Sequence, residues 1–232
     1  MISDFLITSD GQKVAYDHYK NGHEQVVIIA HGFFNSKQAL LIKELAESLS
    51  DEYDVIAFDF RGHGKSEGLF YWTAKEYQDL LVVIEYAHKN YKAIGVIGFS
   101  LGAATSIIAA TKTDFIQSVV AISAPTEFRK VDYHFWDLDI ENDIIYTLIA
   151  EGKIGKGVKP GPFWKKKEKP IALVKDLKVP ILYIHGDRDW VIRPWHSKML
   201  YENTASEKDI AIIKNGPHAE YLIRKNKHEI VA

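Results

Sequence analysis

Short apolar runs, each bounded by polar or turn-forming residues, recur along the chain and predict the strands of a sheet. Two of them, residues 3–9 and 12–19, are joined at Asp10-Gly11, which is a strong hairpin signal. The others have the length and composition of buried strands and lie at 25–30, 54–58, 93–97, 115–122, 180–185 and 210–213. The pattern therefore predicts an eight-stranded sheet whose strands are mostly parallel.

Between the strands, apolar residues take the three- and four-residue spacing of amphipathic helices. Residues 37–49 carry leucines at every fourth position, with charged residues opposite them. Thr73 and Glu76 have the spacing of a capping box and precede a second apolar stripe. The remaining helices are expected at 103–110, 194–203 and 219–229. Strands that alternate with helices in this way predict a three-layer α/β fold with helices on both faces of the sheet.

The alternation is interrupted between residues 124 and 176. This stretch is rich in aromatic residues and contains a Gly/Lys-rich segment at 151–157 and a run of lysines at 165–167. A loop of that length without structure of its own would be unusual, so we expect short helices that form a small cap insertion over residues 124–176. The core domain then consists of residues 1–123 and 177–232.

The composition is typical of one globular domain and argues against several classes of function. Of the 232 residues, 47% are apolar and 26% are charged, and the net charge is −2. This balance argues against nucleic acid as a partner and against stable membrane association. The absence of cysteine excludes a cysteine nucleophile and thiolate zinc sites. No apolar run has the length of a membrane span, and the residues after Met1 do not resemble a signal peptide, so we expect a cytoplasmic protein.

Residues 98–102 carry the most informative motif of the chain, Gly-Phe-Ser-Leu-Gly. They follow the strand expected at 93–97 and lead into the helix expected at 103–110. Strand, Gly-x-Ser-x-Gly and helix are the context of a nucleophile elbow, in which a tight turn presents the serine hydroxyl above the sheet edge. The N–H groups at the start of the helix would face a developing anion. Ser100 is therefore the candidate nucleophile.

A serine hydroxyl needs a neighbouring base and a third group that orients this base. Catalytic groups of open α/β sheets gather at the carboxyl ends of the strands. The strand expected at 180–185 ends shortly before Asp189. The strand expected at 210–213 ends shortly before His218, which lies in a Gly-Pro loop. The order Ser100, Asp189, His218 is the order along the chain that such a triad has.

Other residues compete for the same roles. Asp187 lies two positions from Asp189, and Glu127 is a less favoured substitute acid after the strand expected at 115–122. Glu220 is expected to be a carboxylate at the start of the last helix. The histidines near other strand ends are expected to brace loops or to end a strand, and they are His31, His63 and His185.

Four blocks of the sequence, taken together and in order, resemble the α/β-hydrolase fold superfamily. They span roughly residues 25 to 220 and comprise 31–34, 59–66, 98–102 and 185–189 with the late His218. Within this superfamily the chain is most similar to small bacterial serine esterases. The related groups that it resembles are the serine aminopeptidase-like, monoglyceride lipase-like and cinnamoyl esterase-like hydrolases.

The resemblance assigns a role to each candidate. It implies Ser100 as the nucleophile, His218 as the base and Asp189, three residues after a glycine, as the acid. It also implies an oxyanion hole formed by the backbone N–H groups of Phe33 and Leu101. A triad of this kind acts without a metal or a cofactor, so neither is expected.

Aromatic residues near the site are expected to form the acyl pocket. The candidates for substrate binding are Phe34, Phe163 and Trp164. Half or more of the aromatic residues of the insertion could instead form its own small core. Residues 165–169 fit either a solvated face, which is the favoured interpretation, or a site for an anionic substrate.

These observations predict a carboxylesterase that cleaves small or aromatic acyl esters through a Ser-His-Asp triad and an acyl-enzyme intermediate. Its partner would be a small-molecule ester. Thioesterase, amidase or peptidase, and monoacylglycerol lipase activities remain alternatives because the acyl chemistry is shared. A non-catalytic ligand-binding protein on the same fold is a less favoured alternative.

Overall fold

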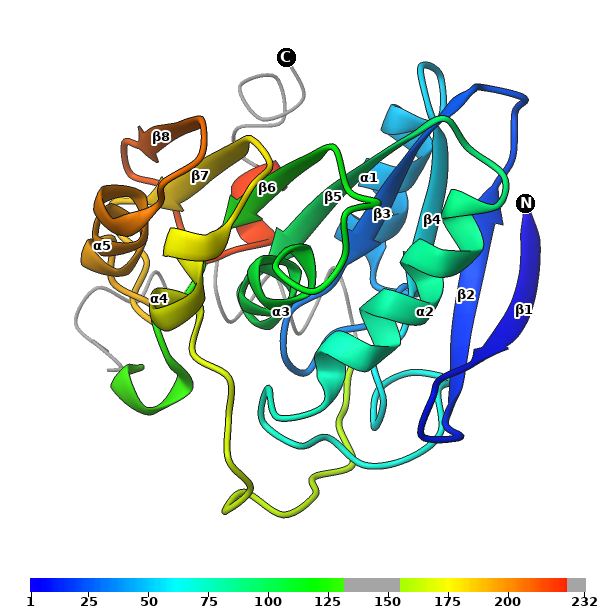
Figure 1. The fold of residues 1–232 in the computed structure, drawn as a ribbon, viewed down its shortest axis with the longest axis horizontal. Coiled ribbons are helices and arrows are strands. Elements are labelled where there is room, and N and C mark those ends of the chain that lie inside the picture. The colour runs from blue at the N-terminus through cyan, green and yellow to red at the C-terminus, as the bar shows by residue number, and fades with distance from the viewer. Residues whose placement is uncertain (132–154, 225–232) are drawn as a thin grey trace.

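The computed structural model describes residues 1–131 and 155–224, and its centre is one sheet of eight strands (Figure 1). The strands follow one another across the sheet in the order β1-β2-β4-β3-β5-β6-β7-β8. Their bounds are β1 (Ile2–Ile7), β2 (Lys13–Tyr19), β3 (Gln25–Ala30), β4 (Asp54–Phe58), β5 (Ala93–Phe99), β6 (Ser118–Ile122), β7 (Ile181–Gly186) and β8 (Lys208–Ile213). The predicted number of strands is thus confirmed.

The sheet is antiparallel only at one edge. Strands β1 and β2 form the predicted hairpin, whose turn places Gly11 at a φ of 81°. Strand β2 also runs antiparallel to β4, whereas the pairs from β4 through β8 are parallel. The carboxyl ends of β3, β5, β7 and β8 therefore meet at one edge of the sheet, where the loops with the candidate residues begin.

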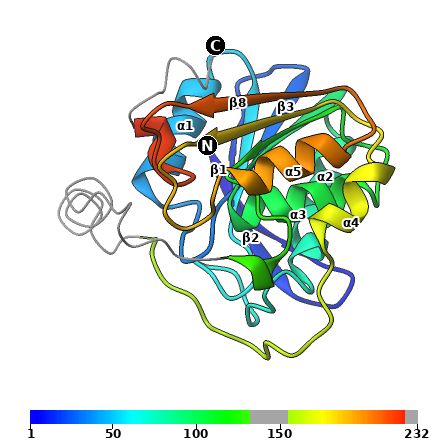
Figure 2. The same ribbon diagram turned by 90° about the vertical axis from the view of Figure 1, so that its left-hand side faces the viewer.

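Helices cover both faces of the sheet (Figure 2). One face packs against α1 (Leu40–Leu49) and the segment 219–223, which contribute Leu45 and Leu222 to a shared apolar core. The other face packs against the helices α2 (Glu76–His88), α3 (Leu101–Ala110) and α5 (Trp195–Asn203). The predicted three-layer arrangement is confirmed. Within the described ranges, no helix has the length and apolar character needed to cross a lipid bilayer.

Helix α2 begins later than the sequence pattern predicts. Its N-cap is Lys75, and no side chain caps its first turn. Thr73 has a φ of 73°, and the buried carboxylate of Glu76 accepts instead a hydrogen bond of 2.6 Å from the N–H of Tyr71. The predicted capping box is therefore wrong, because the N-cap is Lys75 instead of Thr73 and the Glu76 carboxylate accepts from the N–H groups of Tyr71 and Lys75.

The described parts of the insertion contain short helices and an extended loop. The short helices are η1 (Phe128–Lys130), α4 (Pro170–Leu173) and η5 (Val174–Asp176). Residues 155–169 run along the edge of the core, where the N–H of Gly161 donates to the carbonyl of Phe70 over 2.8 Å. The rest of the expected cap, 132–154, and the end of the expected C-terminal helix lie outside the described residues.

Candidate active site

Ser100 lies at the sharp turn between β5 and α3. Its φ of 51° and ψ of −107° are rare for a residue with a side chain, and such strain persists only where the surrounding structure enforces it. Here the Ser100 N–H donates to the carbonyl of Ile122 over 2.8 Å, and its carbonyl accepts from Ala104 over 3.1 Å. Both bonds hold the turn to its neighbours, so that Ser100 is largely buried but borders a cavity.

The glycine after the elbow allows helix α3 to approach the sheet closely. A Cβ atom at Gly102 would collide with the backbone carbonyl of Ala30 at the end of β3. Any larger residue would therefore push the helix away from β3. The Gly-x-Ser-x-Gly pattern thus places the first turn of α3 beside the loop that follows β3.

Asp189 and His218 form a hydrogen-bonded pair beside this turn. The loop after β7 carries Asp189 and the loop after β8 carries His218, whose Nδ1 lies 2.7 Å from Asp189 Oδ2. Oδ1 of the same carboxylate accepts hydrogen bonds from the N–H groups of Val191 and Ile192, at 3.0 and 2.8 Å. Asp189 is fully buried, and His218 lines the same cavity as Ser100. The structure therefore brings the three predicted residues to one place.

The environment of Asp189 favours the carboxylate form. Burial on its own would raise the pKa of Asp189. The charge of His218 and the hydrogen bonds from His185 and His218 outweigh this effect and hold the pKa well below its ordinary value. The competing acids lie elsewhere, since Asp187 is exposed and Glu127 pairs with lysine side chains.

A second histidine contacts the same carboxylate. His185 Nε2 lies 2.7 Å from the carbonyl of Ile192 and 3.2 Å from Asp189 Oδ2. Because both neighbours are acceptors, Nε2 must carry the hydrogen, and Nδ1 accepts from the Ser197 hydroxyl over 2.6 Å. His185 and Ser197 are fully buried. The sequence predicted His185 as the end of a strand, and its contact with the acid was not recognised.

The predicted oxyanion residues border the cavity, and a buried histidine fixes the orientation of one of them. His31 Nδ1 donates to the carbonyl of Gly32 over 2.7 Å, while Nε2 accepts from the N–H of Phe60 over 3.1 Å. The carbonyl of Gly32 and the N–H of Phe33 belong to one planar peptide unit. His31 therefore holds the group whose N–H is proposed for the oxyanion hole. Phe33 and Leu101 both line the cavity.

Two histidines in this region are neutral because they are buried. Burial lowers the pKa of His31 well below its ordinary value and lowers the pKa of His63 to about 4. His63 Nδ1 donates to the carbonyl of Arg61, and its Nε2 accepts from the N–H of Phe34 over 3.4 Å. Neutral rings with one donor and one acceptor nitrogen can make both bonds, whereas imidazolium rings could not.

Glu220 links the loop that carries His218 to the loop that carries Phe33. Its Oε1 accepts a hydrogen bond of 2.6 Å from the N–H of Gly32, and the residue is 5% exposed and lines the cavity. A Cβ atom at position 32 would lie 2.6 Å from Glu220 Oε1, so a larger residue there would displace the Glu220 carboxylate. The sequence predicted Glu220 as a helix-start carboxylate and missed this contact.

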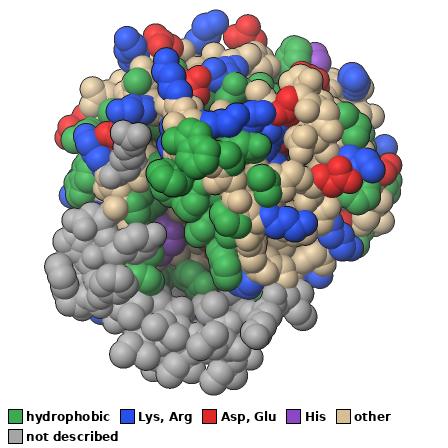
Figure 3. Space-filling model, turned by 90° about the horizontal axis from the view of Figure 1, so that it is seen from below, with side chains coloured by type: hydrophobic (Ala, Val, Ile, Leu, Met, Phe, Trp, Pro, Cys, Tyr) green, Lys and Arg blue, Asp and Glu red, His purple; other side chains and the backbone are tan. Residues whose placement is uncertain are grey.

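The cavity around these residues has a volume of about 380 Å³ and mostly apolar walls. Figure 3 shows the molecule from this side, with a hollow bordered by hydrophobic side chains. Phe34 lines the cavity as predicted, but Phe163 and Trp164 do not. Their rings are 67% and 72% exposed and border neighbouring hollows, because residues 155–169 run past the cavity rather than over it. Trp72 and Phe128, two of the aromatic residues expected near the pocket, line the cavity together with Trp190 and Tyr221, which the sequence did not single out.

No metal site accompanies this arrangement in the part of the chain that the structure describes. Groups of three or more His, Cys, Asp or Glu side chains in a metal-binding arrangement are absent from those residues.

Comparison with known proteins supports the fold and the general chemistry. The model of the alpha/beta hydrolase fold family matches residues 25–142, just over half of the chain. The uncharacterized hydrolase YugF of Bacillus subtilis (strain 168) is 33% identical over 127 residues. These residues are 53% of this chain and 45% of YugF, so the chain spans about half the length of this relative.

Two solved esterase structures are similar over nearly the whole chain. The Pyrococcus furiosus esterase Pf2001 superposes with a TM-score of 0.78 and 25% identity, covering 99% of this chain and 88% of that chain. The esterase RhEst1 from Rhodococcus sp. ECU1013 superposes with a TM-score of 0.79, covering 100% of this chain and 99% of that chain. Its identity of 17% makes it evidence for the fold alone.

Proposed function

The chain belongs to the alpha/beta hydrolase fold family, and from this premise we propose that it is a serine hydrolase that cleaves carboxylic esters through an acyl-enzyme. The observation that carries this proposal is the hydrogen bond of 2.7 Å between Asp189 and His218 beside the strained elbow of Ser100. The esterase Pf2001 supports it as a relative of the same fold. An acid, a base and a nucleophile on one cavity are what acyl transfer requires.

Acylation begins with the Ser100 hydroxyl. Oγ attacks the ester carbonyl carbon while Nε2 of His218 takes its proton, and the carboxylate of Asp189 stabilises the resulting imidazolium. The carbonyl oxygen becomes an oxyanion that the N–H groups of Phe33 and Leu101 bind. Each donor of this kind lowers the barrier by about 2.7–4 kcal/mol. The tetrahedral intermediate then collapses, and His218 returns the proton to the departing alcohol.

Deacylation repeats these steps with water as the nucleophile. His218 removes a proton from a water molecule that attacks the acyl-enzyme, and the same two N–H groups bind the second oxyanion. Collapse of this intermediate returns the proton to Ser100 and releases the carboxylic acid. One water molecule is consumed for each ester cleaved.

The walls of the cavity favour a small or aromatic acyl group. Phe33 and Trp72 stack with ring centroids 5.8 Å apart, and Phe128 packs against Trp72 with centroids 5.2 Å apart. Flat apolar groups bind well to walls of this kind. Hydroxycinnamoyl esters are one class of substrate that fits this description. Thioesters and amides would use the same groups, so substrate comparison decides between them.

The proposal is tested by hydrolysis of p-nitrophenyl acetate and p-nitrophenyl esters of aromatic acids. We expect the Ser100→Ala variant to lose activity by about 10⁴-fold or more, because no other group on the cavity replaces the nucleophile. Its circular dichroism spectrum and melting temperature serve as folding controls. Undiminished hydrolysis by a folded Ser100→Ala variant would refute the proposal.

A further inference from the structure

The catalytic cavity lies beside two hollows with which it shares lining residues. Trp72 and Phe128 line the catalytic cavity and also a second hollow, which is completed by Phe163 and Lys167. Phe128 and Lys167 in turn line a third hollow of about 230 Å³. Shared aromatic residues therefore connect the lining of the catalytic cavity to that of this third hollow, which we call the basic groove.

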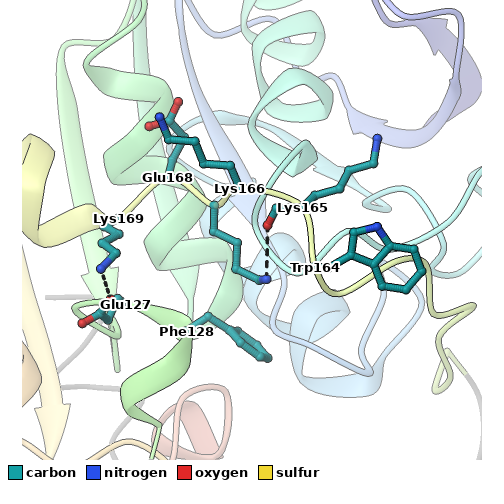
Figure 4. Close-up of a pocket in the computed structure, with 8 residues that line it drawn as sticks. Glu127, Phe128, Trp164, Lys165, Lys166, Glu168 and Lys169 are labelled. Atoms are coloured by element: carbon teal, nitrogen blue, oxygen red, sulfur yellow. Dashed lines mark hydrogen bonds and ion pairs between the residues drawn. The ribbon is translucent and has the colours of Figure 1, made fainter.

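The basic groove is lined by residues 127–128 and 164–169, which include four lysines and two glutamates. Figure 4 shows Phe128 on one side of the loop 164–169, with the side chains of Lys165 and Lys166 extending from the loop away from that ring. An aromatic side chain thus lies between the reacting centre and a group of ammonium ions. A ligand that extended from the cavity would pass apolar walls first and cations afterwards.

Both carboxylates of the groove are matched by lysines outside the run 165–167. Glu127 lies 2.5 Å from the ammonium of Lys169 and 3.3 Å from that of Lys130. The hydrogen bond from Lys169 lowers the pKa of Glu127, which therefore stays ionised and fully paired. Glu168 lies 3.5 Å from the ammonium of Lys112. The two carboxylates of the groove are therefore paired with lysines other than Lys165 and Lys166.

The lysine run has a defined position beside the groove. The ammonium of Lys167 donates to the carbonyls of Phe163 and Lys165, which holds the loop in place. The ammonium of Lys165 lies 5.0 Å from the centre of the Tyr71 ring. An ammonium has three N–H donors, and a ring face engages the cation without using all of them. Such a lysine can therefore contact an anion as well.

We propose that the basic groove binds an anionic group at the end of the ester substrate that lies away from the reacting carbonyl. This inference rests on the proposed esterase function and specifies its substrate class. The substrate would have an apolar or aromatic middle that lies along Trp72 and Phe128. Its distal carboxylate, phosphate or sulfate would lie against Lys165 and Lys166, and it could belong to the acyl part or to the alcohol part of the ester.

The test compares esters that differ only in the distal group. In the first series, linear dicarboxylic acids of increasing length are linked at one end to p-nitrophenol and end either in a carboxylate or in a carboxamide. In the second series, acetate esters of phenols carry the same two end groups on a linker. Rates of the Ser100→Ala variant are subtracted as the background of each compound.

At low salt we expect the protein to prefer the carboxylate over the carboxamide in one of the two series. The preference in kcat/KM should be roughly three- to tenfold, the effect of one or two partly exposed ion pairs, and should lie mainly in KM. Added salt should remove it, because exposed charges are screened. The series that shows the preference identifies the part of the substrate that carries the anion.

The double variant Lys165→Gln/Lys166→Gln should lose the preference and cleave the carboxamides as the unmodified protein does. The control Lys89→Gln/Lys198→Gln removes two exposed lysines, one at the C-cap of α2 and one in α5, that do not line the groove, and should keep the preference. Because both double variants have the same net charge, a difference in preference between them indicates a local contact rather than a general effect of charge.

Two results would overturn the inference: equal rates for carboxylate and carboxamide in both series, or a preference that survives in Lys165→Gln/Lys166→Gln. In either case, carboxamide hydrolysis that depends on Ser100 would leave the proposed esterase function intact. If none of the esters is cleaved in a Ser100-dependent manner, the proposed function itself fails.

Discussion

The proposed catalytic groups are held by polar side chains that are almost completely buried. Asp189 is bonded by two imidazoles and two backbone N–H groups. The Glu220 carboxylate accepts a hydrogen bond from the N–H of Gly32, the residue before Phe33. A buried acceptor that loses its partner costs about 1–3 kcal/mol, so each of these contacts fixes the geometry of its loop. At the scale of the residue, the site therefore depends on contacts around the triad as much as on the triad itself.

Glu220 gives the clearest prediction at this scale. The Glu220→Ala variant leaves the N–H of Gly32 without its acceptor and loosens the peptide unit that carries the Phe33 N–H. We expect kcat for p-nitrophenyl acetate to fall roughly tenfold, with a small change in KM, because the oxyanion is bound only after attack.

The matched control is Glu220→Gln, which keeps an oxygen that can accept from Gly32 and should stay within about threefold of the unmodified protein. A structural role alone would lower the melting temperature of the alanine variant without a selective change in kcat. Equal kcat values for the two variants would contradict the anchoring role of the Glu220 oxygen.

The sequence identifies the residues at motif positions, but not the residues whose contacts keep them in place. Ser100, Asp189 and His218 follow from an elbow motif, from strand ends and from their order along the chain. Glu220 and Gly32 are 188 positions apart, and no local sequence pattern predicts their contact. The contact exists because β3 and β8 end at the same edge of the sheet, which is a property of the fold.

At the scale of the element, the loops after β3 and β4 are joined by two neutral histidines. The ring of His31 bonds the backbone at Gly32 and Phe60, and the ring of His63 bonds the backbone at Arg61 and Phe34. Burial keeps both rings uncharged in the folded protein. The unfolded chain has no such restriction, so protonation favours it as the pH falls below the ordinary pKa of histidine.

This difference predicts an acid-sensitive stability. The pKa of His63 is about 4 in the folded protein against 6.5 ordinarily, so the unfolded state binds more protons between these values. The free energy of unfolding contributed by His63 should therefore fall by about 3 kcal/mol as the pH decreases from 6.5 to 4. Urea unfolding followed by circular dichroism at a series of pH values measures the effect.

Other groups also titrate in this range, and the variant His63→Gln isolates the contribution of one ring. Glutamine offers an acceptor and a donor but does not titrate. The unmodified protein should lose more stability on acidification than this variant. Parallel pH profiles for the two proteins would show that His63 is not kept neutral by the fold.

Most elements were predictable because their patterns are local. The hairpin at Gly11, the apolar strands and the leucine-bearing helix all rest on residues that are close in sequence. The start of α2 was not, because the chain at Thr73 takes a positive φ and the buried Glu76 carboxylate also bonds to the loop at Tyr71. Phe163 and Trp164 lie outside the catalytic cavity for a similar reason: the path of their loop depends on bonds to residues near Phe70 that the sequence pattern does not reveal.

At the scale of the whole molecule, one sheet edge gathers residues that are far apart along the chain. Strands β3, β5 and β8 lead to Phe33, Ser100 and His218 on a single cavity, and β7 leads to Asp189, which is bonded to His218. Helices cover both faces of this sheet, and the loop at 155–169 lines the hollows beside the cavity. The parallel order of the strands is thus the reason that the candidate triad can form.

The most direct test of this account is reaction with a fluorophosphonate, followed by intact-mass measurement and peptide mapping. Such a reagent phosphonylates a serine only where a base activates it beside an oxyanion hole. If His218 activates Ser100, we expect one phosphonyl group per chain, located on Ser100, and none on a folded Ser100→Ala variant. An unmodified protein that stays unlabelled, or a label that persists in Ser100→Ala, would contradict it.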